Sequence, residues 1–168
     1  MNTIYYRPFE SLIGRLILAW TSKGICRLVL PGYGLDSLDA WAARYIREYR
    51  LMAYHDQYEG VTQLEEYFQG KRRYFECPLD LYGPGFSKKV WRAVSTVAYG
   101  TTATYKDIAV AVGKPSACRA VGNANRKNPV PIIIPCHRII GSDNSLTGYA
   151  GGLHIKKALL DLEKITKI

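Results

Sequence analysis

An apolar run that ends in a cysteine and two basic residues constrains this chain more than any other feature. The run covers residues 128–138 and has the sequence NPVPIIIPCHR. Pro135 restricts the backbone that enters Cys136, and His137 is placed to accept the proton of the thiol. A segment this apolar is expected to be buried, so Cys136 should face a pocket rather than open solvent. The pattern indicates an activated nucleophile held in a preformed cavity.

The length and composition allow one medium domain or two small ones that share an interface. The chain has 168 residues, of which 48% are hydrophobic. No apolar run approaches the ~18 residues that a membrane span needs. Residues 1–18 also lack the basic start and unbroken apolar stretch of a secretory signal. We therefore expect no membrane association and a cytoplasmic location, or a nuclear one in a eukaryote.

The positive charge is confined to the second half of the chain. Residues 1–84 contain 10 Lys+Arg and 10 Asp+Glu, whereas residues 85–168 contain 13 Lys+Arg and 4 Asp+Glu. The whole net charge of +9 therefore lies in the half that holds Cys136. Such asymmetry is typical of a protein that binds a polyanion, most often nucleic acid. Charge that serves only solubility is the alternative interpretation.

The cysteines give no metal or redox motif. Cys26, Cys77, Cys118 and Cys136 form no Cys-x-x-Cys pair, which argues against a zinc ribbon. Cys26 and Cys77 could pair with each other or, with His55, contribute to a metal site, but a complete four-ligand site is not expected from that half alone. No nucleotide or flavin motif is visible either, and we predict no cofactor and no metal.

The first half predicts an α/β domain with a small antiparallel sheet. Three segments rich in Ile, Leu, Tyr and Val predict the strands: residues 2–8, 12–20 and 24–30. Helical spacing of apolar residues predicts helices over residues 37–52 and 60–68, and residues 75–81 could add a strand. Breaker residues at 82–85 coincide with the change in charge balance, so the predicted domains are 1–84 and 85–168.

The second half predicts a mostly helical domain that contains a helix-turn-helix. A first helix should cover residues 86–97 with Ser87 as its N-cap. Two shorter helices are expected over residues 105–112, capped by Thr104, and 115–125, joined by a turn at Gly113. The last helix has small side chains and a lone arginine, Arg119, so its backbone can approach a groove closely. The fold class is therefore α+β.

Several motifs in the second half resemble the 6-O-alkylguanine-DNA alkyltransferases, also called methylated-DNA–protein-cysteine methyltransferases. The resemblance extends over nearly half of the chain, in order and at compatible spacing. It rests on these segments: TYKDIA at 104–109, RAVG at 119–122, NPVP at 128–131, IPCHR at 134–138, GYAGG at 148–152, Lys156, and LLDLE at 159–163. Residues 1–84 are compatible with the variable N-terminal domain of that family.

The resemblance implies a chemistry that the residue types also support. Cys136 would take the alkyl group from guanine, His137 would act as general base, and Glu163 would orient the imidazole as in a triad. A free thiol has a pKa of roughly 8.5 and is mostly protonated at neutral pH, so it needs such a base. The alternative for Glu163 is an i, i+4 partner of Lys167 on a solvated helix face.

The resemblance also implies how the base reaches the thiol. The target lies inside a duplex and must leave the stack. Arg119 would fill the gap from the minor groove, and the backbone of Cys136 and Ile139 would recognise the guanine edge. The other implied substrate contacts are Tyr105, Asn128, Pro131, Tyr149 and Lys156. The other expected DNA contacts are Ala117, Cys118 and Gly122 on the same helix. The basic residues Arg126, Lys127, Lys88 and Lys89 are expected to contact phosphates, without base specificity. For Tyr149, an ordinary core aromatic is the alternative, and His154 is expected at the surface.

Four functions remain to be compared. The first is single-turnover transfer of alkyl groups from guanine, and secondarily thymine, in double-stranded DNA to Cys136 of a monomer. The second is a module that binds alkylated bases without chemistry and recruits other repair factors, but such a module does not need Cys136, His137 and Glu163. A transcriptional regulator needs base-reading side chains that residues 115–125 lack. A cysteine hydrolase needs an oxyanion hole, which no sequence feature indicates.

Overall fold

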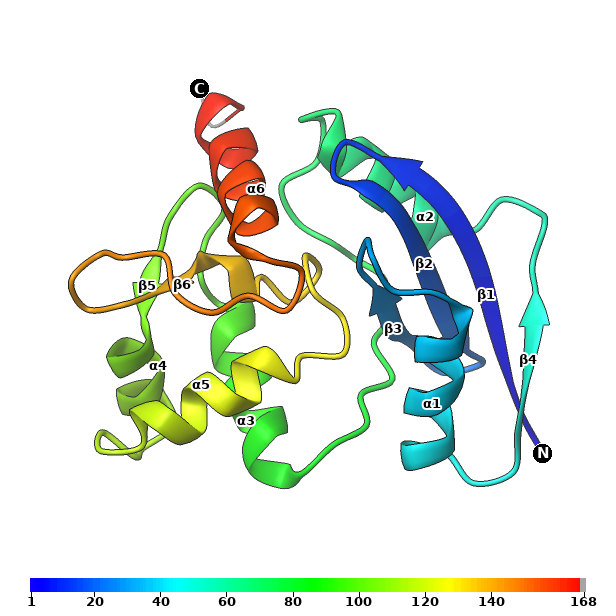
Figure 1. The fold of residues 1–168 in the computed structure, drawn as a ribbon, viewed down its shortest axis with the longest axis horizontal. Coiled ribbons are helices and arrows are strands. Elements are labelled where there is room, and N and C mark those ends of the chain that lie inside the picture. Colours follow the sequence, from blue (N-terminus) through cyan, green and yellow to red (C-terminus); the bar gives the residue numbers. More distant parts are fainter. Residues whose placement is uncertain (167–168) are drawn as a thin grey trace. The chain divides into compact units, whose positions relative to one another are not determined.

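The computed structural model describes residues 1–166, and the chain divides into two compact units between Tyr82 and Gly83. The first unit contains most of the β-structure and the second is mainly helical, so the fold class is α+β as the sequence predicts (Figure 1). None of the helices within residues 1–166 combines the length and apolar character needed to cross a membrane.

A four-stranded sheet with a helix on each face forms the first unit (Figure 1). Its elements are β1 (Asn2–Ser11), β2 (Gly14–Thr21), β3 (Gly24–Val29), α1 (Leu35–Tyr45), β4 (Tyr49–Ala53) and α2 (Glu59–Phe68). The strand order is β3-β2-β1-β4, and only the β1–β4 pair is parallel. Ile17 and Ala19 pack in the cluster that includes α1, whereas Leu18 lies against Gly60 of α2. The central strand β2 is therefore buried on both faces.

The prediction of one helix over residues 37–52 is wrong in its second part. The helix α1 ends at Tyr45, because Ile46 is extended and Glu48 has a positive φ of 51°. Residues 49–53 then form β4, which pairs with β1. Tyr49 continues the helical spacing only by coincidence, and its hydroxyl donates to Asp39 on α1. The strand predicted over residues 75–81 reduces to a single bridge between Leu79 and Ile25.

The second unit builds a helix-turn-helix and a buried active-site segment. Its elements are α3 (Gly85–Ser95), β5 (Ala103–Thr104), α4 (Tyr105–Ala111), α5 (Cys118–Arg126), the 3-10 turn η1 (Cys136–Arg138), β6 (Ile139–Ile140) and α6 (Leu153–Ile165). The strands β5 and β6 pair in parallel, with Ala103 opposite Ile139. This short pairing places the start of α4 beside the residues that follow Cys136.

The helix starts in this unit differ in part from the prediction. Thr104 caps α4 as expected, in a capping box with Asp107. Ser87 is not the N-cap of α3, because Pro84 occupies that position and Ser87 is buried inside the helix. Pro115 does not lie in the first turn of α5, which begins three residues later at Cys118.

Candidate active site

The residues before Cys136 form a rigid buried turn. Asn128 Nδ2 donates to the Ile134 carbonyl oxygen at 2.8 Å, and Asn128 Oδ1 accepts from the Val130 N–H at 2.9 Å. The Cys136 N–H donates to the same Ile134 oxygen at 2.8 Å, which closes an inverse γ-turn at Pro135 (φ −81°, ψ 61°). Proline suits this turn because its ring fixes φ near that value.

Backbone strain lies within the same loop. Ile132 is buried and has a φ of 73°, a conformation that β-branched residues rarely adopt. Such a residue costs of order 1–3 kcal/mol and persists only where its surroundings hold it. The two Asn128 hydrogen bonds lie on either side of Ile132 in the chain and supply that restraint.

The Cys136 thiol is protonated at neutral pH. Its side chain is buried, with the residue 5% exposed, and burial raises the pKa of the thiol to about 11. A hydrogen bond with Asn128 and the positive charge of Lys156 act in the opposite direction but do not overcome burial. Since only the thiolate is a strong nucleophile, Cys136 needs a proton acceptor before it can react.

His137 and Glu163 form a fully buried pair. His137 Nε2 lies 2.7 Å from Glu163 Oε1, so this network assigns the ring proton to Nε2. His137 Nδ1 has no hydrogen-bond partner among residues 1–166 and is left as an acceptor. Burial lowers the pKa of His137, although Glu163 opposes this shift. The imidazole is therefore neutral and able to take up a proton.

Glu163 is ionised over the whole physiological range. Burial alone would raise its pKa, but hydrogen bonds from His137 and Arg138 lower the pKa of Glu163 to about 2. The alternative of a solvated helix face is wrong, because Glu163 is 0% exposed. Lys167, its partner in that alternative, lies outside the described residues.

Arg138 belongs to the same buried group, although the sequence indicated it only as part of the motif. Its Nε donates to Glu163 Oε2 at 3.0 Å and its Nη2 to Glu163 Oε1 at 2.9 Å. Its Nη1 donates to the Val97 carbonyl oxygen at 2.7 Å. An arginine that follows a Cys-His pair is a weak signal, since spacing alone does not tell whether it is buried.

Lys156 is a second buried cation. Its Nζ donates to the Ile139 carbonyl oxygen at 2.5 Å and to the Thr147 carbonyl oxygen at 2.9 Å. The Thr147 oxygen also accepts from the Tyr105 hydroxyl at 3.0 Å. One carbonyl group therefore connects α6, the loop before it and the first residue of α4. Burial lowers the pKa of Lys156.

Two further polar side chains lie near Cys136. The Tyr149 hydroxyl is buried without a partner among residues 1–166, and burial followed by the negative charges of Cys136 and Glu163 raises its pKa. The alternative of an ordinary core aromatic does not account for this unpaired hydroxyl. Asn125, which the sequence did not single out, donates from Nδ2 to the Cys136 carbonyl oxygen at 3.3 Å.

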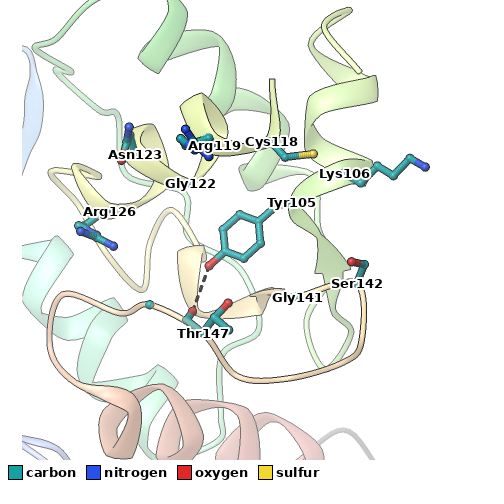
Figure 2. Close-up of a pocket in the computed structure, with 11 residues that line it drawn as sticks. Tyr105, Lys106, Cys118, Arg119, Gly122, Asn123, Arg126, Gly141, Ser142 and Thr147 are labelled. Carbon is teal, nitrogen blue, oxygen red and sulfur yellow. Dashed lines mark hydrogen bonds between the residues drawn. The ribbon is translucent and has the colours of Figure 1, made fainter. Parts of the chain in front are cut away.

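A cavity of about 500 Å³ lies between α4, α5 and the loop after β6. Five of the predicted substrate or DNA contacts line it: Tyr105, Cys118, Arg119, Gly122 and Arg126. Figure 2 shows Tyr105 between α5 and Thr147, with its hydroxyl directed at the Thr147 carbonyl group. Lys106 extends away from Tyr105 (Figure 2).

The other predicted contacts do not line this cavity. Ala117 is the N-cap of α5 and Lys127 its C-cap, while Asn128 and Pro131 are buried in the loop that follows. Cys136 is not part of the cavity wall either. The Thr147 carbonyl group at the cavity accepts hydrogen bonds from Tyr105 and from the buried Lys156. His154 is exposed, as expected.

The four cysteines are free, so Cys26 and Cys77 do not form a disulfide. Burial raises the pKa of Cys26 to about 12, which makes it an inert core residue. Within residues 1–166, no group of three or more His, Cys, Asp or Glu side chains could hold a metal ion.

Comparison with known proteins gives matches along almost the whole chain. Residues 85–165 match the family model of the 6-O-methylguanine DNA methyltransferase DNA-binding domain, and residues 4–81 match that of its ribonuclease-like domain. The methylated-DNA–protein-cysteine methyltransferase of Methanosarcina barkeri is 47% identical over 162 residues, which cover 96% of this chain and 98% of that protein. The protein of the same name from Mycobacterium tuberculosis is 52% identical over 163 residues, with coverage of 96% and 93%.

The solved structures agree. The crystal structure of Mycobacterium tuberculosis OGT in complex with DNA superposes with a TM-score of 0.84 at 39% identity, over 96% of this chain and 94% of that chain. The matched family models and these relatives extend over both units. The chain therefore belongs to the 6-O-methylguanine DNA methyltransferase family.

Proposed function

We propose that this protein repairs double-stranded DNA by moving the alkyl group of 6-O-alkylguanine, and secondarily of 4-O-alkylthymine, to Sγ of Cys136. The supporting observation is that Cys136, His137 and Glu163 are buried together in the order that proton transfer requires. The next residue, His137, has an acceptor nitrogen without a partner among the described residues, and its other nitrogen is bonded to Glu163. Family membership supports the same reaction.

The transfer follows from the protonation states of these groups. His137 Nδ1 accepts the thiol proton of Cys136, directly or through one water, and Glu163 stabilises the imidazolium. The thiolate attacks the alkyl carbon, so a sulfur–carbon bond forms while the bond from carbon to the guanine 6-oxygen breaks. The electron pair remains on the base, which takes up one proton and becomes guanine. The proton lost by the thiol balances the one gained by the base.

We assign rotation and binding of the alkylated base to the cavity between α4 and α5 and to the residues around it. The alkylated nucleotide rotates out of the duplex through the minor groove, Arg119 takes its place in the stack, and Tyr105 assists the rotation and bonds the base. Small side chains at Ala117, Cys118 and Gly122 let α5 approach the groove. Arg126 and Lys127 contact phosphates, which position the protein without sequence preference.

The remaining substrate contacts surround Cys136. Pro131 and Tyr149 line the alkyl and base pocket, and the backbone of Cys136 and Ile139 recognises the guanine edge. Lys156 neutralises charge on the departing guanine, and its bond to the Ile139 carbonyl group supports this placement. Asn128 ties the helix-turn-helix to the active-site loop.

The reaction runs once per molecule. The product is a thioether on Cys136, and thiol exchange does not cleave a carbon–sulfur bond to an alkyl group. No step of this proposal needs a cofactor. We infer a cytoplasmic location for the protein, since thiols remain reduced in that compartment and all four cysteines are free.

Intact mass spectrometry tests the proposal. The protein is incubated with excess duplex that contains one 6-O-methylguanine and is then mapped by peptides. We expect a gain of one methyl group per chain on Cys136, stopping at one equivalent, in the wild type and in C118S but not in C136S. Tight binding without a mass change would reject transfer and favour the competing hypothesis of a lesion-binding module that recruits other factors. Repeated turnover would reject the single-use mechanism.

A further inference from the structure

We propose that Arg138 is a positioning residue for proton transfer, acting through the Glu163 carboxylate that orients His137. The inference rests on the proposed transfer to Cys136 and adds a residue to its machinery. Arg138 is a buried cation to which the family motif gives no role beyond a position after His137.

The contact between Arg138 and Glu163 is a two-point fork. The Nε and Nη2 atoms of Arg138 bond to different oxygens of Glu163, at 3.0 and 2.9 Å. A planar guanidinium that binds both oxygens fixes the plane of the carboxylate as well as its position. The oxygen that receives Nη2, Oε1, is also the one that lies 2.7 Å from His137 Nε2. The two bonds from Arg138 therefore fix the direction of the hydrogen bond between His137 Nε2 and Glu163 Oε1.

Arg138 is itself anchored from the other side. Its Nη1 bonds to the Val97 carbonyl oxygen at 2.7 Å, and its guanidinium carbon lies 5.5 Å from the centre of the Tyr99 ring. The residue is 6% exposed. The Gly100 N–H also donates to Glu163 Oε2, at 3.3 Å. The segment after α3 thus holds the arginine in place, and the arginine holds the carboxylate.

The positive charge of Arg138 influences whether His137 is neutral or protonated to an imidazolium. The charged groups that act on His137 are Glu163 and Lys156 from α6 and Arg138 from η1. The titratable groups beside them are Cys136, which is next to His137 in the chain, and Tyr149, which interacts with Cys136 and Glu163. With Arg138 in place, the ionised carboxylate is neutralised and His137 remains uncharged. Without this cation, the negative charge of Glu163 would raise the pKa of His137, and the pair would take up a proton. An imidazolium at His137 cannot accept the proton of Cys136.

The test compares R138M, which removes the charge, with R138K, which keeps the charge but not the fork. Single-turnover transfer from a methylated duplex is measured between pH 5 and pH 9. In R138M the rate should fall and the acidic limb of the profile should move up by roughly one to three pH units. In R138K the acidic limb should stay near that of the wild type. The rate should fall by about tenfold, because one of the two hydrogen bonds to Glu163 is lost. R92M, at an exposed position of α3, is the matched control and should keep the wild-type profile.

Two results would overturn the inference. One is a slower R138M whose acidic limb has not moved, as expected for a merely structural role. The other is R138K with its limb displaced as far as that of R138M. If R138M does not fold, a ¹⁵N NMR titration of the imidazole in the wild type and in R138Q, which is uncharged but keeps an amide donor, provides the answer without any transfer. A raised imidazole pKa in R138Q supports the inference, and an unchanged pKa contradicts it. A wild type that transfers nothing would reject the proposed function but would leave this NMR result valid.

Discussion

At the scale of single residues, the reactive pair rests in its uncharged form. Burial raises the pKa of Cys136 and lowers that of His137, so neither group is ionised at neutral pH. Both shifts have the same cause, because an apolar environment disfavours any charge. The proton has to move at the time of reaction, and the fixed carboxylate of Glu163 favours that movement.

The low pKa of Glu163 predicts a loss of stability in acid. Its pKa is about 2 in the folded protein against an ordinary value of 4.5, so it stabilises the fold above pH 4.5 and loses this effect as the pH falls toward 2. Between pH 5 and pH 3 the wild type should lose about 2 kcal/mol more unfolding free energy than E163Q. His137 acts in the same direction in both proteins, because its pKa is also lowered.

Urea unfolding at several pH values measures this difference. Parallel pH dependence in the two proteins would show that the carboxylate is not held ionised by the fold. E163Q should be less stable than the wild type at pH 7, because it leaves the buried Arg138 without its anionic partner.

The sequence could identify some site residues and not others. Cys136 and His137 are adjacent, so their proximity needs no fold. Glu163 became a candidate only through the family resemblance, since 26 residues separate it from His137. Arg138 and Asn125 were missed as separate contributors because their roles depend on which carboxylate or carbonyl group the folded chain places beside them. The roles of all these residues in transfer stay predictions until they are measured.

At the scale of elements, the start of α4 positions Tyr105. The Thr104 hydroxyl accepts from the Asp107 N–H at 3.1 Å, and Asp107 accepts from the Thr104 N–H at 2.8 Å. Tyr105 is the first residue of the helix and is therefore fixed by this capping box. The parallel β5–β6 pair adds a second restraint just before it.

Removal of the cap should destabilise the unit measurably. T104A should lose about 1 kcal/mol of unfolding free energy, because one helical N–H loses its acceptor. T102A, at an exposed position two residues earlier, is the control and should change stability by less than about 0.5 kcal/mol. Equal effects of the two variants in urea unfolding would contradict the importance of the capping box.

Substitution of Arg119 on α5 separates the effect of base rotation on transfer from that of the chemical step. R119A should slow transfer from a methylated duplex by roughly tenfold or more, because unstacking costs a few kcal/mol that the arginine offsets. Transfer from the free base 6-O-methylguanine should stay unchanged, since this substrate has no stack to leave. Transfer rates from quantitative mass spectra give the comparison, and an equal loss on both substrates would place Arg119 in the chemical step instead.

The errors in the predicted elements have different physical causes. The three antiparallel strands and the helix-turn-helix were predicted because their residue patterns are local. β4 was missed because an exposed edge strand carries a weak pattern and forms only where β1 offers its edge. The prediction of Ser87 as a cap was wrong for a different reason: the chain is already helical from Gly85, so Pro84 at the domain boundary is the N-cap and Ser87 lies inside the helix.

At the scale of the whole molecule, charge divides the chain more sharply than hydrophobicity does. Half of the chain is neutral and half carries the excess of nine positive charges. Binding of this protein to DNA should therefore weaken steeply with salt, in proportion to the number of phosphates contacted. The candidate contacts include Lys88, Lys89, Arg126 and Lys127.

Salt titration of DNA binding measures that number. In K88Q/K89Q the slope of log K against log salt should decrease by about two, because each phosphate contact contributes roughly 0.9. R44Q/R47Q removes two exposed charges from the first unit and should leave the slope unchanged. A smaller slope in the second variant as well would mean that both units contact the DNA backbone.

The burial of Cys136 also bears on how long an idle molecule stays competent. Peroxides, disulfides and soluble alkylating agents attack thiolates, and a thiol with a pKa of about 11 offers them almost none. Cys118, on the cavity wall, is more accessible to such reagents. For a protein that reacts once, a buried and protonated Cys136 slows the loss of unused molecules to such reagents. A larger share of the pool then remains available when damage occurs.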